Sequence, residues 1–167
     1  MKPISRLAIA SAMALTASLG AAQAQGNLTV ALQLEPPHLD PTSAAAGAID
    51  SVVYSNIFEG LTRFMGDGSI VPGLAESWDI SDDGLIYTFR LRDGVTFHDG
   101  TAMDAEDVKF SLDRARAEDS ANAQKALFAA ISEVEVVDPL TVKITLSEPN
   151  GLFLFNLAWG DAVIVAP

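Results

Sequence analysis

The 167-residue chain contains no cysteine and only two histidines. The absence of cysteine excludes disulfides, thiol nucleophiles and cysteine-based zinc sites. His38 and His98 are far apart in the sequence, and a zinc site needs three or four ligands. We therefore expect no metal and no cofactor.

Basic residues are also scarce. Ten Lys and Arg stand against 22 Asp and Glu, which gives a formal net charge of −12. So acidic a surface argues against nucleic acid and anionic lipid as partners. The same charge is compatible with a cationic ligand, but solubility explains it equally well.

Long apolar stretches are lacking except near the start of the chain. Two basic residues precede an uncharged apolar run over residues 7–19, and Ala22 and Ala24 then place small residues where a signal peptidase reads them. The run is short of the roughly 20 residues that a membrane-spanning helix needs. The pattern predicts a secretory signal peptide over residues 1–24, cleaved before Gln25. With no cysteine to carry a lipid, we expect a soluble protein in a Gram-negative periplasm.

The rest of the chain mixes predicted strands and helices. Alternating or apolar segments predict strands at residues 28–33, 61–71 (a hairpin), 74–91 (a pair of strands), 133–138, 141–146 and 162–166. Helical spacing of apolar residues predicts helices at 44–60, 104–117, 121–130 and 150–159. No regular βαβ alternation is present, so the sequence predicts a single α+β unit.

One predicted helix has a well-defined start. Asp104 is suited to cap its N-terminus, and Asp107, three residues on, completes a capping box. Val108, Leu112 and Ala115 would then form one apolar stripe.

Two stretches resemble a known family. In residues 76–101, Asp-Gly turns separate strand-like alternations, and residues 104–112 follow as the capped helix. Both resemble the extracytoplasmic solute-binding proteins of family 5, which serve ABC importers of oligopeptides, dipeptides and nickel complexes. Further segments resemble the family in the same order: 39–41, 56–61, 72–78, 97–101 and 138–149.

The resemblance implies a fold and a function. It implies the N-terminal portion of a type II (cluster C) periplasmic-binding-protein-like bilobal fold, with a mixed sheet and flanking helices. Residues 25–167 would supply the first strand and loop of lobe I and then its accessory subdomain, incomplete at the C-terminus, so that the chain would be a fragment. The implied role is that of a monomeric, non-enzymatic receptor, which captures a peptide-like solute and docks on an ABC permease in the inner membrane.

The resemblance also points to one loop as the ligand-binding segment: Glu35, Pro36, Pro37 and His38. In oligopeptide-binding relatives, an acid at the position that matches Glu35 lies near the peptide site. Its carboxylate would pair with a cationic solute group, or else face water. The two prolines would stiffen this wall, or else only shape a loop. The solute itself stays open among a dipeptide, an oligopeptide, an opine, a glycoside and a metal chelate.

Two other functions remain as alternatives. A secreted acidic hydrolase would need paired carboxylates, for which Asp99, Asp104, Glu106 and Asp107 are candidates, although turns and helix capping already account for them. A sensor or chaperone for a membrane partner would use the same fold without transport. Four aromatic residues either line a solute wall or fill the core, and we expect the core: Trp78, Phe153, Phe155 and Trp159.

Overall fold

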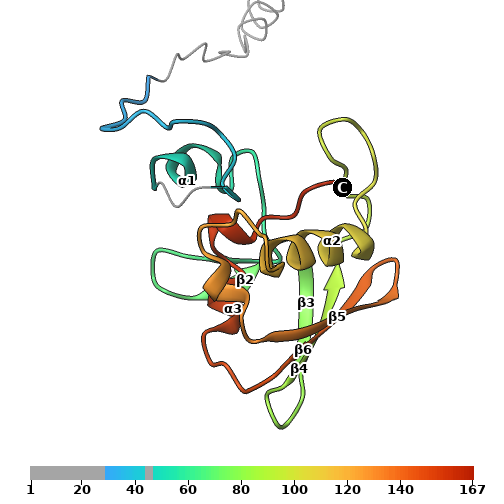
Figure 1. Cartoon of the computed structure of the whole chain (residues 1–167). Helices are drawn as coiled ribbons and strands as arrows, with labels where there is room; N and C mark the ends of the chain where they lie inside the picture. The colour runs from blue at the N-terminus through green and yellow to red at the C-terminus, as the bar shows by residue number, and fades with distance from the viewer. Residues whose placement is uncertain (1–28, 44–46) are drawn as a thin grey trace, which may run out of the picture. The chain divides into compact units, whose positions relative to one another are not determined.

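The computed structural model describes residues 29–43 and 47–167 (Figure 1). The predicted signal peptide and its cleavage site lie outside these residues. Residues 32–167 form one folded unit. Among the described residues, no helix has the length and apolar character needed to cross a membrane.

An antiparallel four-stranded sheet is the centre of this unit. Its strands lie in the order β3 (Ala75–Ile80), β4 (Ile86–Leu91), β6 (Thr141–Leu146) and β5 (Ile131–Asp138). On β4, Tyr87, Phe89 and Leu91 are buried, as their alternation with polar residues predicts. Phe89 lies opposite Trp78 on one side and Val142 on the other, so the fully buried Phe89 and Val142 lie in the middle of the sheet.

The predicted capped helix is present as α2, Ala105–Arg116. Asp104 Oδ1 accepts a hydrogen bond from the Glu106 backbone N–H at 2.8 Å, and Asp107 Oδ2 accepts one from the Asp104 N–H at 2.8 Å. Both bonds satisfy donors that the first turn of a helix leaves free, which confirms the predicted capping box.

Helix α2 covers one face of the sheet (Figure 1). Its stripe of Val108, Leu112 and Ala115 is buried against the strands, as predicted. The helix therefore contributes its apolar side to the core and leaves Arg114 exposed on the other side.

The predicted hairpin forms beside this layer as β1 (Thr62–Phe64) and β2 (Ile70–Pro72). Gly68 adopts a φ of 85° in its turn, a conformation that favours glycine. At the base of the hairpin, the Gly73 N–H donates to the Leu61 carbonyl at 3.1 Å.

The N-terminal part of the unit differs from the prediction. Residues 29–33 form no strand, and Val30 and Leu32 are exposed, since no strand among the described residues pairs with them. Of the helix expected over 44–60, residues 44–46 lie outside the described residues, and α1 covers Gly47–Val53. It ends where Ser55 turns to a φ of 57°, so Gly60 is not its C-terminus.

The C-terminal elements are also shorter than predicted. Residues 121–130 form only the 3-10 turn η1, Lys125–Phe128, because the Asn122 side chain accepts from the Gln124 N–H and holds a turn there. The helix expected at 150–159 is α3, Phe153–Asn156, followed by the 3-10 turn η2, Gly160–Ala162.

The strand expected at 162–166 does not form, although Val163 and Ile164 are buried. Its backbone is held by single contacts instead of a ladder. The Ile164 N–H donates to the Glu59 carbonyl at 2.9 Å, and the Val165 N–H donates to Ser111 Oγ at 3.0 Å.

Candidate functional site

The predicted ligand loop lies at the surface of the unit. Glu35, Pro37 and His38 are exposed, and Pro36 is half-buried. The loop has no helix or strand, in keeping with its prolines. At the end of the segment, the Asp40 N–H donates a hydrogen bond to His38 Nδ1 at 3.3 Å. The Glu35 carboxylate is therefore accessible to a solute.

A tight turn anchors this loop directly after His38. Thr42 donates to Asp40 Oδ1 through its backbone N–H at 2.9 Å and through its hydroxyl at 2.7 Å. Pro41, between them, is buried. Burial opposes ionisation of Asp40, but the hydrogen bonds from Thr42 and the nearby charge of Arg114 hold its pKa below the ordinary value. The loop is thus fixed at one end.

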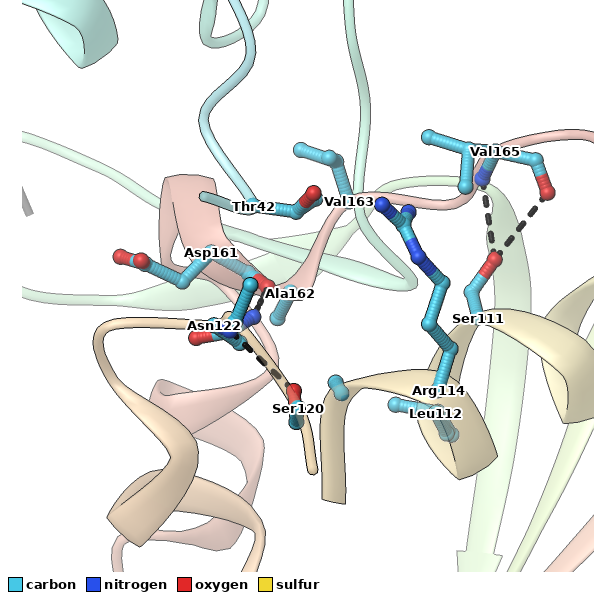
Figure 2. Close-up of a pocket in the computed structure, with 12 residues that line it drawn as sticks. Thr42, Ser111, Leu112, Arg114, Ser120, Asn122, Asp161, Ala162, Val163 and Val165 are labelled. Carbon is cyan, nitrogen blue, oxygen red and sulfur yellow. Dashed lines mark hydrogen bonds between the residues drawn. The ribbon is translucent and has the colours of Figure 1, made fainter. Parts of the chain in front are cut away.

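Next to this anchor is a small crevice, shown in Figure 2, which encloses about 40 Å³. Thr42, Arg114 and Ser120 lie on its wall together with Asp161 and Val165. A volume of this size has room for water but not for a peptide. We therefore regard the crevice as a junction between segments and not as a solute site.

Hydrogen bonds of Ser111 join the segments at this junction. Its hydroxyl donates to the Asp107 carbonyl at 2.8 Å and accepts from the Val165 N–H at 3.0 Å, which ties α2 to the C-terminal segment (Figure 2). Asn122 provides a second tie, since its side-chain amide donates to the Asp161 carbonyl at 2.9 Å. Neither role was expected from the sequence, because each partner is more than 35 residues away and no local pattern signals it.

A larger and more apolar hollow, of about 320 Å³, lies beside the predicted motif 97–101. Its volume falls at the lower end of the range of small-molecule sites. The lining combines apolar side chains with a few polar ones: Ile57, Phe58, Glu59, Leu74, Val95, Phe97, His98, Asp99, Met103 and Ile164. The hollow can accept an apolar group, and the polar residues of its lining include Glu59, His98 and Asp99.

Asp99, in the segment 97–101, has a structural role. The Thr101 N–H and hydroxyl donate to Asp99 Oδ1 at 2.9 and 2.7 Å, and these bonds lower the pKa of Asp99. Asp104 and Asp107 are likewise occupied by the capping box of α2. Three of the four carboxylates considered for hydrolase chemistry, those of Asp99, Asp104 and Asp107, are therefore engaged in turns and caps.

The histidines stay separate in the structure. His38 lies in the ligand loop and His98 in the lining of the hollow, and both are exposed. Within residues 29–43 and 47–167, no three His, Asp or Glu side chains gather in a way that could hold a metal ion.

The aromatic residues divide between core and surface. Phe153 is buried and packs edge-on against Tyr87, with 4.8 Å between ring centroids, which confirms its expected place in the core. Trp159 is 37% exposed, and the expectation of a core position is wrong for this residue. It packs edge-on against Phe155, which in turn contacts Phe64, so these three rings form a surface cluster.

Comparison with known proteins adds to this geometry. The family described as "Bacterial extracellular solute-binding proteins, family 5 Middle" matches residues 69–165, more than half of the chain. The glutathione-binding protein GsiB of Pectobacterium atrosepticum is 44% identical over 129 residues, which cover 77% of this chain and 25% of that protein.

Two solved structures show the same fold. The binding protein AgaA of A. tumefaciens R10, in complex with agropinic acid, has a TM-score of 0.73 and 37% sequence identity. The match covers 78% of this chain and 26% of the AgaA chain. The periplasmic binding protein DppA of Helicobacter pylori, in complex with the peptide STSA, has a TM-score of 0.71 and 33% sequence identity. The match covers 79% of this chain and 29% of the DppA chain. The chain thus spans between a quarter and a third of the length of these relatives.

Proposed function

Because the chain belongs to the family 5 bacterial extracellular solute-binding proteins, we propose that it acts in the periplasm as the substrate-binding component of an ABC importer. Its solute is a small peptide-like molecule, which it delivers as a monomer to the permease in the inner membrane. Residues 1–24 direct its export and are removed before Gln25. The role requires no nucleic acid and no catalytic step.

The observation that carries this proposal is the range of solutes held by proteins of the same fold and similar sequence. The relatives bind glutathione, agropinic acid and the peptide STSA. Glutathione and STSA are short peptides with a free ammonium group and a free carboxylate. Two of the three solutes are thus peptides, and the proposal of a peptide-like solute rests on those two relatives.

The loop 35–38 carries a carboxylate, that of Glu35, which is complementary to the ammonium group of a peptide. Glu35 is exposed, and the loop that carries it is anchored by the turn at Asp40 and by the buried Pro41. A carboxylate on an anchored loop can accept a hydrogen bond from a solute ammonium group without first ordering a mobile segment. We propose that Glu35 makes this contact and that Pro36, Pro37 and His38 complete the wall around it.

The test is a binding measurement on the protein purified from the periplasm. Isothermal titration with glutathione and a panel of short peptides should find a solute that binds, and Glu35→Gln should weaken that binding. A charged hydrogen bond contributes about 1.5–3 kcal/mol, so the dissociation constant should rise at least 10-fold. Glu133→Gln, which neutralises an exposed acid on β5, is the matched control and should leave affinity unchanged.

Two outcomes would contradict the proposal. Equal affinity in the Glu35→Gln variant and the control would remove Glu35 from the site. Sustained release of product from any peptide would contradict the binding role itself and favour the hydrolase alternative.

A further inference from the structure

The four-stranded sheet has two edges, β3 and β5. An edge strand presents a row of backbone N–H and C=O groups that can pair with a strand of another molecule. Residues 134–137 of β5 read Val-Glu-Val-Val, a composition that favours strand pairing, and Val137 is exposed. Strand β5 is therefore a surface on which two copies of the chain can join.

The register of the sheet shows which backbone groups of β5 face its free edge. The Leu146 N–H donates to the Leu85 carbonyl at 2.8 Å, so the backbone groups of Leu146 face β4. Backbone groups alternate in direction along a strand, and those of Ile144 therefore face β4 as well. Val134 lies opposite Ile144, so its own N–H and carbonyl point away from β6, toward the free edge.

Charged side chains of α2 already occupy carbonyls of this strand. Helix α2 packs on β5 (Figure 1). Lys109 Nζ donates to the Val134 carbonyl at 2.9 Å. Arg116 Nη1 donates to the carbonyls of Ile131 at 3.2 Å and Ser132 at 3.3 Å. Hydrogen bonds from charged donors are stronger than those between neutral groups, so a new strand would have to displace them.

Asp113 holds both cations in place. Its Oδ2 accepts from Lys109 Nζ at 2.7 Å and its Oδ1 from Arg116 Nε at 2.9 Å, at the helical spacings of four and three residues. The three side chains are only 28% to 40% exposed, so solvent screens their charges in part. Burial opposes ionisation of Asp113, but the bonds from Lys109 and Arg116 keep its pKa below the ordinary value.

Two irregularities of register shorten the part of β5 that is open to pairing. They lie between Ile131 and Glu133 and between Val136 and Asp138. Such irregularities bend an edge and interrupt its ladder. In the regular stretch between them, Val134 faces the free edge, and Lys109 takes its carbonyl.

We propose that Lys109 and Arg116, held by Asp113, cap the free edge of β5 and prevent it from pairing with β5 of a second copy. Antiparallel pairing of two such edges would break the charged bonds. It would also bring together the exposed acids Glu133 and Glu135 of both copies, which repel each other. This inference concerns only association between copies, so its failure would leave the proposed solute capture untouched.

Sedimentation velocity over a wide range of concentration tests the cap. The wild-type chain should stay monomeric. Lys109→Met/Arg116→Met keeps the apolar stems but has no donors, so its average mass should rise about twofold as two β5 edges pair in a closed dimer. Arg90→Met/Lys125→Met makes the same change of charge and side chain away from β5 and should stay monomeric. Lys109→Arg/Arg116→Lys, which keeps both charged donors, should also stay monomeric.

Cross-linking identifies the surface that associates. The chain has no cysteine, so a single introduced thiol reports its own position. With a flexible bis-maleimide, Val137→Cys should give a covalent dimer in the Lys109→Met/Arg116→Met background and none in the wild-type background. Gly66→Cys, in the turn between β1 and β2, is the control and should give no dimer in either.

Three results would overturn the proposal. The first is a Lys109→Met/Arg116→Met variant as monomeric as the wild type, and the second is association without cross-linking through Val137→Cys. The third is a wild-type background that already cross-links through Val137→Cys. If circular dichroism shows the double variant to be unfolded, Lys109→Met alone undergoes the same two measurements.

A further measurement uses the wild-type chain. Nitrogen-15 NMR should show slow hydrogen exchange at Lys109 Nζ, because Asp113 and the Val134 carbonyl hold its ammonium group. Exchange as fast as that of a free lysine would overturn the proposed cap.

Discussion

Replacing Gly73 by alanine tests how closely the hairpin base packs on the rest of the unit. A Cβ at residue 73 would lie 2.6 Å from the Gly60 carbonyl oxygen and 3.1 Å from that of Leu61. Ordinary contacts of this kind begin at 3.4 Å, so one backbone segment must move by several tenths of an ångström. Both oxygens accept hydrogen bonds, from the N–H groups of Leu74 and Ala75 among others, and the movement would weaken these bonds.

The expected cost follows from these contacts. Overpacking in a well-packed region costs about 1–3 kcal/mol, and each weakened hydrogen bond adds up to about 1 kcal/mol. We expect Gly73→Ala to lower the free energy of unfolding by about 3 kcal/mol, a large part of the 5–15 kcal/mol typical of a domain. Urea denaturation followed by the fluorescence of Trp78 and Trp159 measures the change, which should lower the midpoint by roughly 1.5 M.

Gly151→Ala is the matched control, because a Cβ there would meet no atom within 4 Å. Its free energy of unfolding should change by no more than about 0.5 kcal/mol. Equal midpoints for the two variants would refute the argument that backbone contact requires glycine at residue 73.

Substitutions at two further residues test the hydrogen bonds that hold α2 in place. Ser111→Ala removes the bond to the Val165 N–H and should cost about 1–3 kcal/mol in urea denaturation, because a donor is left unpaired; no loss would show that water replaces the hydroxyl. Asp104→Ala removes the N-cap and should cost about 1 kcal/mol, whereas Asp104→Asn should retain most of the stability. Equal losses for both Asp104 variants would contradict the capping role.

The sequence predicted the elements whose determinants are local. The alternation at Tyr87, Phe89 and Leu91 needs only neighbouring residues, and β4 forms as expected. The capping box of α2 needs only Asp104 and Asp107, three positions apart, and it forms too. Family membership also followed from local motifs, and the match over residues 69–165 confirms it.

Features that depend on tertiary packing could not be predicted. Helix α1 ends early, at Val53, and Ser55 then adopts a left-handed conformation; a segment with helical spacing gives no signal of this. The contact between Asp50 and Gly160 joins residues more than a hundred positions apart, and no local pattern signals it. Trp159 was expected in the core by its type, yet its ring packs in a surface cluster.

The ligand loop 35–38 was predicted only in part from the sequence. Its prolines predicted an irregular segment, and the structure has one at Glu35–His38. The turn that anchors it, from Asp40 to Thr42, uses the local hydrogen bonds typical of Asp followed by a hydroxyl residue. Contact of the loop with a solute stays a prediction.

Native mass spectrometry of the protein recovered from the periplasm tests solute capture most directly. After incubation with a mixture of short peptides, the account predicts a polypeptide that begins at Gln25 and carries one non-covalently bound solute of peptide mass, released unchanged on heating. A polypeptide that binds none of the peptides, or that returns them cleaved, would contradict it.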